Sequence, residues 1–246
     1  MQLILFDVDG TLAVSKHTIK PEMVDILKSL RASGKYHLGI VGGGPYANIE
    51  AQILPENMSL FEYVFCENGC VAYHRGEKIH EISLKDVTPE YALQEMIDEI
   101  LQLIVNEKNL PYKRGSFINF RNGMMYITPI GGDATVPERQ VFMEYDQNHK
   151  IRKKMILHLS DKFEHKFNYK FYLGGSVGFG AHPIGWDKTY CIQHFDHVGY
   201  NKVYFFGDRM TSPDGNDYTL GTHPRIKGIP VGNPNDTLKK IKSILL

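Results

Sequence analysis

The chain has 246 residues, enough for one large domain or two modest ones, each with a buried core. Hydrophobic residues at 42% and charged residues at 23% are typical of an ordinary soluble globular protein. The 28 Lys and Arg balance the 28 Asp and Glu, so no global field attracts nucleic acid or a membrane surface, and we expect neither as a partner. No apolar stretch approaches ~20 residues, so we expect no membrane span.

The three cysteines Cys66, Cys70 and Cys191 lie in or beside apolar runs. A zinc site at Cys66 and Cys70 would need two more ligands nearby, and none has a suitable spacing. We therefore expect buried free thiols in a reducing compartment, and a cytoplasmic protein.

The first third of the chain alternates strands with helices. This order favours a mainly parallel sheet covered by helices. The predicted elements are strands at 2–5, 36–41 and 63–66, and helices from Pro21 to Gly34 and from just after Gly44 to near Pro55.

The middle of the chain changes to bunched strands and helices, which indicates an antiparallel α+β unit. One hairpin turns at Gly76, and a second turns at Asn122-Gly123, a pair that favours the tight primed turn. The predicted elements are strands at 70–73 and 78–81, a long helix after Pro89, strands at 116–121 and 124–127, helices at about 137–145 and 150–163, and strands at 169–173 and 177–182.

The α/β rhythm returns at Gly185, with a helix containing Ile192 and Phe195, a strand at 203–206 and a final helix. We therefore predict an α/β fold in two domains. A discontinuous Rossmann-type core with a parallel sheet comprises 1–81 and 185–246, and an inserted α+β cap comprises 82–184.

The segment Asp7-Val8-Asp9-Gly10-Thr11 follows the first strand and carries the strongest chemical signal. Two carboxylates at the carboxyl end of a strand project into the crevice where open α/β sheets hold ligands. Asp7 can attack phosphorus and help to bind a cation, and Asp9 can give and take a proton. Gly10 lets the backbone turn, so that Thr11 can face a phosphoryl oxygen.

Further charged residues complete the predicted core site. Asp208 ends an apolar strand and should lie beside Asp7, so that both, with the backbone carbonyl of Asp9, suit Mg²⁺. Asp217 is a predicted supporting carboxylate. The ammonium of Lys188 can neutralise the nucleophile and the incoming phosphate.

The first motif resembles the phosphoryl-transfer aspartate signature of the haloacid dehalogenase superfamily. Six later segments, in the same order, resemble the eukaryotic-type phosphomannomutases. They are Glu67-Asn68-Gly69, Arg114-Gly115-Ser116-Phe117-Ile118, Phe120-Arg121-Asn122-Gly123-Met124, Pro129-Ile130-Gly131, Gly185-Trp186-Asp187-Lys188 and Phe205-Phe206-Gly207-Asp208.

The resemblance implies a Rossmann-like core with a mobile lid and a cap-mediated homodimer. It also implies Mg²⁺, a hexose 1,6-bisphosphate activator and a phosphosugar substrate. By motif match, Arg121, Asn122 and Arg139 bind the sugar and its distal phosphate in the cap, where guanidinium groups fit phosphate. Lys16 takes the place of a substrate-binding arginine that follows the aspartate loop.

The chain departs from the family at several substrate positions. Backbone amides of Gly43 and Gly44 can cradle phosphate, but the resemblance implies Gly-Gly-Ser-Asp there, so Gly44 replaces a phosphate-binding hydroxyl. A family arginine is Gly132 here. The family's serine and aspartate before Gly185 are Gly178 and Gly180. His223 stands where the family places an aspartate of an accessory cation site.

Three functions remain open on these grounds. The first is a phosphomannomutase-like phosphotransferase that interconverts hexose 6-phosphate and hexose 1-phosphate through an aspartyl phosphate on Asp7. The second is a Mg²⁺-dependent phosphatase of a phosphorylated metabolite. The third is a paralogue that binds a phosphosugar or a partner with little turnover. The glycines at the substrate positions favour the third, and the complete set Asp7, Asp9, Asp208 and Lys188 opposes it.

Overall fold

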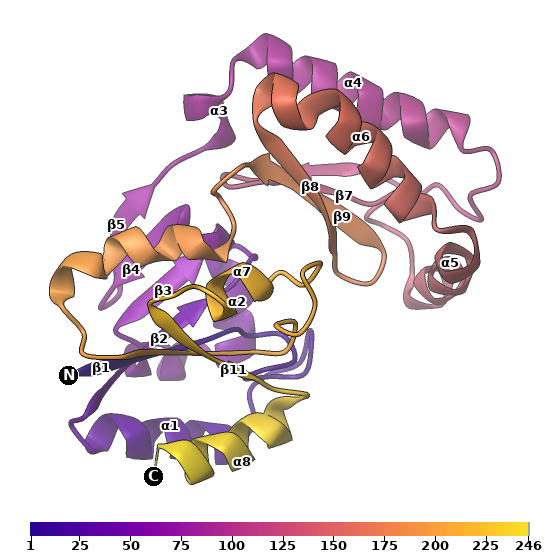
Figure 1. Ribbon diagram of the computed structural model, residues 1–246. Coiled ribbons are helices and arrows are strands. Elements are labelled where there is room, and N and C mark those ends of the chain that lie inside the picture. The colour runs from indigo at the N-terminus through magenta and orange to yellow at the C-terminus, as the bar shows by residue number, and fades with distance from the viewer. Residues whose placement is uncertain (246) are drawn as a thin grey trace. The chain divides into compact units, whose positions relative to one another are not determined.

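The computed structural model describes residues 1–245, which fall into two compact units. Unit 1 consists of Met1–Glu81 together with the segment that begins at Gly185, and unit 2 is Ile82–Ile184. Figure 1 shows unit 1 in indigo, purple, orange and yellow, because its two halves come from opposite ends of the chain. Unit 2 is one continuous stretch.

A seven-stranded sheet forms the centre of unit 1, in the order β11-β10-β1-β2-β3-β4-β5. The first five strands in this order pair in parallel, and β4 and β5 add an antiparallel edge. Central strands of a parallel sheet are buried on both faces, which explains their nearly continuous apolar sequences. The strands are β1 Gln2–Phe6, β2 Tyr36–Val41, β3 Tyr63–Cys66, β4 Val71–His74, β5 Glu77–Glu81, β10 Val203–Gly207 and β11 Ile226–Pro230.

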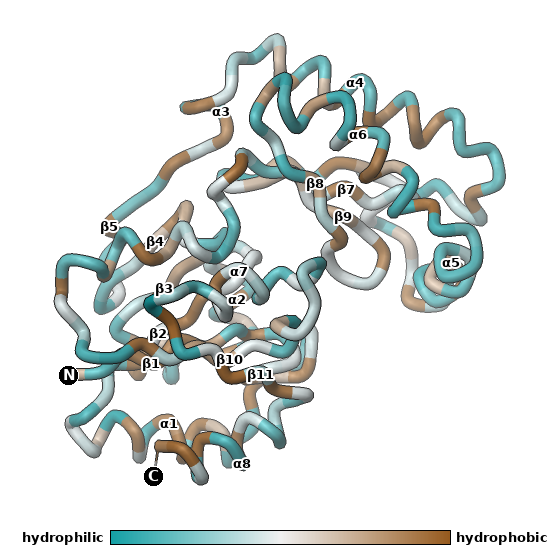
Figure 2. Tube along the Cα trace, viewed as in Figure 1, coloured by the Kyte–Doolittle hydropathy of each residue, from teal (hydrophilic) through white to brown (hydrophobic). Residues whose placement is uncertain are grey.

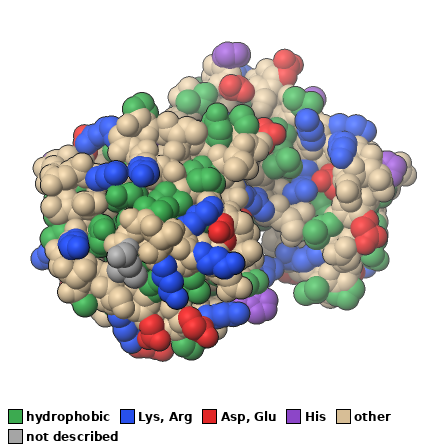
Figure 3. All heavy atoms as spheres, turned by 60° about the horizontal axis from the view of Figure 1, so that its bottom comes forward, with side chains coloured by type: hydrophobic (Ala, Val, Ile, Leu, Met, Phe, Trp, Pro, Cys, Tyr) green, Lys and Arg blue, Asp and Glu red, His purple; other side chains and the backbone are tan. Residues whose placement is uncertain are grey.

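Alternating side chains of the central strands divide the core of unit 1 into two layers. Ile4 and Phe6 belong to the layer under helices α1 (Pro21–Ala32), α2 (Tyr46–Ile53) and α8 (Pro234–Ile244). Leu3 and Leu5 belong to the opposite layer. In Figure 3, α1 and α8 are turned toward the viewer, and Lys and Arg side chains are spread between hydrophobic ones.

The short helices η3 (Lys188–His194) and α7 (Tyr218–Gly221) contribute to the second layer of unit 1, whereas η1 (Pro55–Leu60) packs with α1 and α2 on the first. Cys191 of η3 and Leu220 of α7 are fully buried against Leu5 and Phe205 of the sheet. The other short helices of the unit are η2 Glu67–Gly69 and η4 Asp196–Val198.

Unit 2 has a four-stranded antiparallel sheet in the order β6-β7-β9-β8, with helix α6 packed on β8 and β9 and helix α4 packed against α6. Helix α4 alternates between hydrophobic and hydrophilic colour from turn to turn in Figure 2. Its residues Leu93, Met96, Ile100 and Ile104 are buried, so its apolar stripe belongs to the core of unit 2. The elements are α3 Leu84–Val87, α4 Glu90–Asn106, β6 Ile118–Phe120, β7 Met125–Ile127, α5 Val136–His149, α6 Ile151–Phe167, β8 Tyr169–Gly174 and β9 Gly178–Pro183.

Some predicted elements are wrong in type or extent. The helix predicted around Ile192 and Phe195 is a pair of 3₁₀ helices, η3 and η4. The turn at Asn122-Gly123 is not a primed turn, since neither residue has the positive φ that such a turn requires. Strand β11 and helix α7 are additional elements that the sequence pattern did not predict.

Candidate active site

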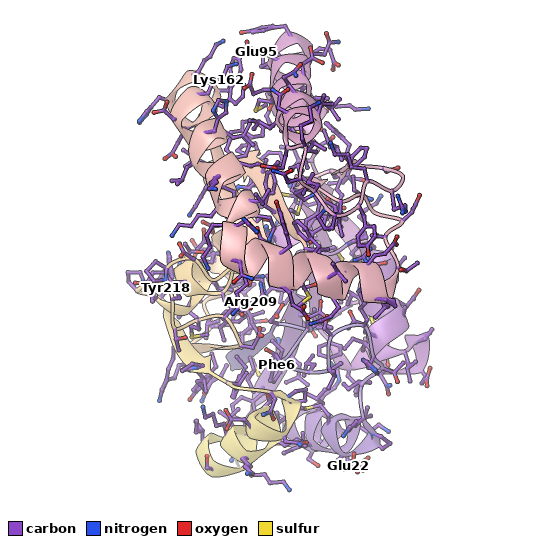
Figure 4. The ribbon with its side chains drawn as sticks, turned by 90° about the vertical axis from the view of Figure 1, so that its right-hand side faces the viewer. Phe6, Glu22, Glu95, Lys162, Arg209 and Tyr218 are labelled. Atoms are coloured by element: carbon purple, nitrogen blue, oxygen red, sulfur yellow. The ribbon has the colours of Figure 1, made fainter. Side chains whose placement is uncertain are left out.

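The two aspartates predicted to act together follow neighbouring strands. Asp7 comes directly after β1 and Asp208 directly after β10, and these strands pair in parallel. The Asp7 N–H donates to the Phe206 carbonyl at 2.9 Å. Carboxylate oxygens of Asp7, Asp208 and Asp217 all lie within 4.8 Å of one another. Figure 4 labels their chain neighbours Phe6, Arg209 and Tyr218.

The loop after Asp7 is shaped by its own backbone bonds. The Val8 carbonyl accepts the N–H groups of Thr11, Leu12 and Ala13 at 3.2, 3.0 and 3.0 Å. Gly10 has φ +76°, and a Cβ there would lie 2.6 Å from the Asp208 carboxylate. Glycine is therefore required both for the backbone conformation and for the approach of Asp208.

Lys188 joins two of the three carboxylates. Its Nζ lies 2.6 Å from Asp7 Oδ1 and 2.5 Å from Asp217 Oδ1, and its side chain is only 1% exposed. Asp187 caps the start of η3 by accepting the Thr189 N–H at 2.8 Å, which fixes the backbone beside Lys188. The second oxygen of Asp217 accepts the Arg209 N–H at 2.9 Å. Asp217 thus orients Lys188 and the loop after β10.

The cluster holds more negative charge than Lys188 can balance. Burial raises the pKa of Asp7 to about 7, and Asp217 and Asp208 add to the rise while Lys188 opposes it. Burial and Asp217 also raise the pKa of Asp208. Burial alone would lower the pKa of Lys188, but Asp217 and Asp7 outweigh it and raise that pKa. The pKa of each carboxyl is therefore raised by burial and by repulsion between the carboxylates, and a bound cation would relieve that repulsion.

The same residues fit a divalent oxygen-binding cation. Carboxylate oxygens are the ligands that Mg²⁺ prefers, and this ion keeps waters and substrate oxygens for its remaining positions. Two buried polar atoms in the same loops as the aspartates, Thr11 Oγ1 in the loop after Asp7 and Asn216 Oδ1 just before Asp217, have no hydrogen-bond partner among the described residues. Buried polar atoms are normally satisfied, so the surroundings of the cluster are suited to a polar guest.

Asp9 lies apart from the three carboxylates. Its Oδ1 accepts the Gln52 side-chain amide at 2.9 Å and the Lys16 N–H at 3.3 Å. Its side chain is not a member of the metal-binding group, so only its backbone carbonyl remains a predicted metal ligand. Sequence reasoning missed Gln52, which lies on α2, 43 residues further along the chain.

The glycine loop after β2 is held by the segment after β3. The Gly42 carbonyl accepts the Asn68 N–H at 2.9 Å, and the Gly44 carbonyl accepts the Glu67 N–H at 3.1 Å. Asn68 Nδ2 also donates to the Trp186 carbonyl at 3.0 Å. Gly43 and Gly44 therefore lie at the same edge of the sheet as Asp7, directly before α2.

The predicted substrate arginines belong to unit 2. Arg121 follows β6, donates from Nε to Asn119 Oδ1 at 3.0 Å and places its guanidinium 5.2 Å from the centre of the Tyr126 ring. Arg139, in the first turn of α5, donates to the carbonyls of Ala134 at 2.8 Å and Gly132 at 2.7 Å. Asn122 accepts the Leu84 N–H through its carbonyl.

No second metal cluster accompanies the first within residues 1–245, where Asp7, Asp208 and Asp217 form the only group with closely spaced ligand atoms. The ring Nδ1 of His223 accepts the Arg225 N–H at 3.3 Å. Cys66, Cys70 and Cys191 are buried and free, and burial raises the pKa of the Cys66 thiol to about 12. Across the same residues, no helix has the length and apolar character to cross a bilayer.

Solved structures of known proteins share this fold. IMP-bound IMP-nucleotidase of Plasmodium falciparum matches with a TM-score of 0.68 at 15% identity, covering 100% of this chain and 68% of its own. A haloacid dehalogenase-like hydrolase from Bacteroides thetaiotaomicron matches with a TM-score of 0.58 at 17% identity. This match covers 97% of this chain and 91% of the hydrolase. The chain therefore has the α/β fold of these proteins, which confirms the predicted fold class.

Sequence relatives give a narrower result. Residues 23–246 match the eukaryotic phosphomannomutase family. The phosphomannomutase of Glycine max is 41% identical over 244 residues, or 99% of this chain and 96% of the relative. That of Schizosaccharomyces pombe is 38% identical over 245 residues, or 98% and 93%. The chain belongs to the eukaryotic phosphomannomutase family, which confirms the predicted family.

Proposed function

We propose that the protein is an isomerase that transfers a phosphoryl group between O6 and O1 of a hexose phosphate through an aspartyl phosphate on Asp7. The observation that carries this proposal is the buried contact of Asp7 with Lys188 at 2.6 Å beside Asp208 and Asp217. A carboxylate held next to a fixed ammonium is suited to attack phosphorus, because the charge of the entering phosphate is compensated.

Asp7 and Asp9 divide the chemistry between them. A carboxylate oxygen of Asp7 forms a bond to phosphorus of a hexose 1,6-bisphosphate, while the bond from phosphorus to the sugar oxygen breaks. Asp9 gives a proton to the leaving oxygen and later takes one from the sugar hydroxyl that receives the phosphate. Because Gln52 and the Lys16 N–H hold Asp9, its side chain must turn toward the reacting oxygen during the cycle.

Mg²⁺, when bound by Asp7, Asp208 and the Asp9 carbonyl with Asp217 in support, supplies charge that stabilises the phosphoryl oxygens. Lys188 holds its proton because two carboxylates surround it. Amides of Gly43 and Gly44, at the start of α2, bind the transferred phosphate.

Unit 2 acts as the cap in this proposal. Arg121, Asn122 and Arg139 bind the sugar and the phosphate that is not transferred, and Lys16 adds a cation at the edge of the aspartate loop. A cap that closes over the site excludes water, which is what separates a mutase from a phosphatase built on the same core.

One assay tests the function. Purified protein, Mg²⁺ and mannose 1-phosphate are incubated with and without a hexose 1,6-bisphosphate, and mannose 6-phosphate and free phosphate are measured. Isomer formation that depends on the bisphosphate supports the mutase. Free phosphate as the main product indicates a phosphatase, and absence of both indicates a binding protein. Asp7→Asn should abolish turnover, and persistent turnover would reject Asp7 as the nucleophile.

Two broader features stay proposals. A homodimer formed through unit 2 follows from the family resemblance, and sedimentation velocity measures the mass directly. The cytoplasmic location is supported by the three buried free thiols and is tested by fractionating cells that express the protein with a tag.

A further inference from the structure

The sheet of unit 2 has two unlike faces. On the first, the Phe171 ring lies 6.4 Å from the Phe163 ring of α6, and Phe171 is in register with Ala181, which is in register with Met125. Successive side chains of a strand point to opposite faces. The next row belongs to the second face, and it consists of Tyr126 on β7, Gly180 on β9 and Tyr172 on β8.

Both tyrosines of this row lie across strand β9. Tyr126 starts on β7, and its hydroxyl donates to the Gly174 carbonyl on β8 at 2.9 Å. Tyr172 starts on β8, and its hydroxyl lies 3.6 Å from the sulfur of Met124, just before β7. The Tyr126 side chain therefore crosses β9 from β7 to β8, and the Tyr172 side chain crosses β9 from β8 to β7. A tyrosine that reaches from one strand over its neighbour to the next must lie nearly flat on the sheet.

Glycines on β9 make room for these rings. A Cβ at Gly180 would lie 2.5 Å from Cζ and Oη of Tyr172, and a Cβ at Gly178 would lie 2.5 Å from the same atoms of Tyr126. No side chain fits at either position while the rings keep their place. The tyrosines and glycines form one packed arrangement, which we call the tyrosine platform (Tyr126, Tyr172, Gly178 and Gly180).

Two strands of the sheet carry cationic side chains at the platform, and the carboxylate near Gly178, that of Asp146, is ion-paired with Arg152, which donates to the Gly178 carbonyl. The Arg121 guanidinium lies over the Tyr126 ring, and the His182 ring lies 5.0 Å from the Tyr172 ring. Lys170 is in register with His182, two residues from Tyr172, and so belongs to the same face. Strands β6 to β9 contain no Asp or Glu. This face is therefore aromatic and cationic, which is complementary to a sugar that carries phosphate.

We propose that the tyrosine platform is a sugar-binding surface, on which the pyranose ring of a hexose phosphate stacks while Arg121 binds its phosphate. This inference rests on the proposed function for the class of substrate. The negative face of an aromatic ring attracts the weakly positive C–H groups that one side of a pyranose presents. Gly178 and Gly180 have no side chain that could form a hydrogen bond to a sugar hydroxyl. The platform therefore accepts both mannose and glucose phosphates, which differ in configuration at C2.

The absence of hydrogen-bonding side chains at Gly178 and Gly180 predicts a low substrate specificity at C2. Contacts to apolar surface discriminate between similar substrates far less than buried hydrogen bonds to a hydroxyl do. We expect kcat/KM for mannose 1-phosphate and glucose 1-phosphate to differ by less than about tenfold. A several-thousandfold preference for one of the two sugar phosphates would overturn the proposal, because some protein group would then have to form a hydrogen bond to the C2 hydroxyl.

Substitution of Tyr172 tests the stacking. In the full-length protein, Tyr172→Leu should raise KM for the hexose phosphate about five- to tenfold with little change in kcat, and Tyr172→Phe should recover most of the loss because it keeps the ring. Tyr91→Leu, at an exposed tyrosine of α4 in the same unit, is the matched control and should leave KM unchanged. An unchanged KM in folded Tyr172→Leu would overturn the platform while leaving the mutase function in place.

A binding measurement covers the case in which Tyr172→Leu does not fold or the wild-type protein shows no turnover. Asp7→Asn protein with ¹³C-labelled tyrosine rings is titrated with glucose 1-phosphate and, separately, with inorganic phosphate. Ring signals of Tyr126 and Tyr172 should shift with the sugar phosphate and stay within a fraction of that shift with phosphate alone. Equal shifts with both ligands, or none with either, would overturn the proposal independently of catalysis.

Discussion

Lys188 is the cation that compensates the buried carboxylates of the candidate site. It is almost completely buried between Asp7 and Asp217. Lys188→Met should destabilise unit 1 by about 3–5 kcal/mol, because removing one partner leaves buried charge without compensation. Urea unfolding at pH 8 without divalent ions measures this. Lys162→Met, which removes an exposed ion pair with Glu99, should cost under about 1 kcal/mol.

A double substitution at Lys188 and Asp7 checks the cause. If the loss comes from unpaired carboxylates, Lys188→Met combined with Asp7→Asn should be less destabilised than the sum of the two single variants. Additive effects would mean that Lys188 stabilises through packing alone.

Asp7 gives Mg²⁺ binding a defined pH dependence. With the pKa of Asp7 raised to about 7, the folded protein keeps a proton there that the unfolded chain has already lost. Ionisation therefore destabilises the metal-free protein as pH rises toward 7, and Mg²⁺ must displace the proton below that pH. Mg²⁺ affinity measured by calorimetry should fall from pH 8 to pH 6. Equal affinity at both would contradict the raised pKa.

Gly180 and Tyr172 should behave as a coupled pair. Gly180→Ala should cost about 1–3 kcal/mol, because its Cβ would overlap the tyrosine ring. In combination with Tyr172→Ser the same change should cost much less. Chemical denaturation of the two single variants and the double variant gives the coupling energy. A coupling near zero would show that the ring moves aside freely.

At the scale of elements, local pattern predicted strands well and short helices poorly. The bounds 36–41 and 63–66 were predicted as observed, since both are apolar runs bounded by turn residues. The spacing of Ile192 and Phe195 suits a 3₁₀ helix as well as an α-helix, because residues three apart lie on nearly the same face of either helix. Strand β11 contains Lys227, Gly228 and Pro230, which hide its strand pattern, and it forms through pairing with β10.

The buried carboxylate of Glu62, just before β3, is bound to the turn of the β4–β5 hairpin. Glu62 is 3% exposed, and its Oε1 accepts from His74 Nε2 at 3.0 Å and Arg75 Nε at 2.7 Å. Burial alone would raise the pKa of Glu62, but these hydrogen bonds outweigh it and hold that pKa below the ordinary value. Its contribution to stability is therefore present above the unfolded-state pKa and is lost as pH falls through the lowered one.

Acid unfolding tests this link. Glu62→Gln should lower stability at pH 7 and make unfolding less steep in pH below about 4.3, where free glutamate titrates. Glu77→Gln, at an exposed position of β5, serves as the control. Identical acid profiles for wild type and Glu62→Gln would remove Glu62 as a source of pH-dependent stability.

At the scale of the whole molecule, sequence motifs identified residues whose proximity only the fold establishes. Asp7 and Asp208 could be placed together because both follow strands of one parallel sheet. Gln52 and the two tyrosines of the platform could not, since no motif contains them and their contacts arise from strand register and helix placement. Asp217 was predicted as a support, and the structure adds its bond to Lys188.

Binding of Mg²⁺ should act on one unit only. Because all three carboxylates belong to unit 1, Mg²⁺ should slow amide exchange in β1, β10 and their loops and leave unit 2 unaffected. Hydrogen-exchange mass spectrometry with and without Mg²⁺ measures this. Asp208→Asn should remove the protection, and protection of the unit 2 strands would contradict a site confined to unit 1.

The neighbouring strands β1 and β10 have a consequence for synthesis on the ribosome. Translation produces Asp7 before unit 2, but β1 lacks one neighbour until β10, which follows unit 2 in the chain, has emerged. The intervening continuous segment can meanwhile complete its own four strands. A nascent chain stopped before β10 therefore holds a finished insert and an incomplete sheet, so the three carboxylates of the candidate site come together only when both segments of unit 1 have met.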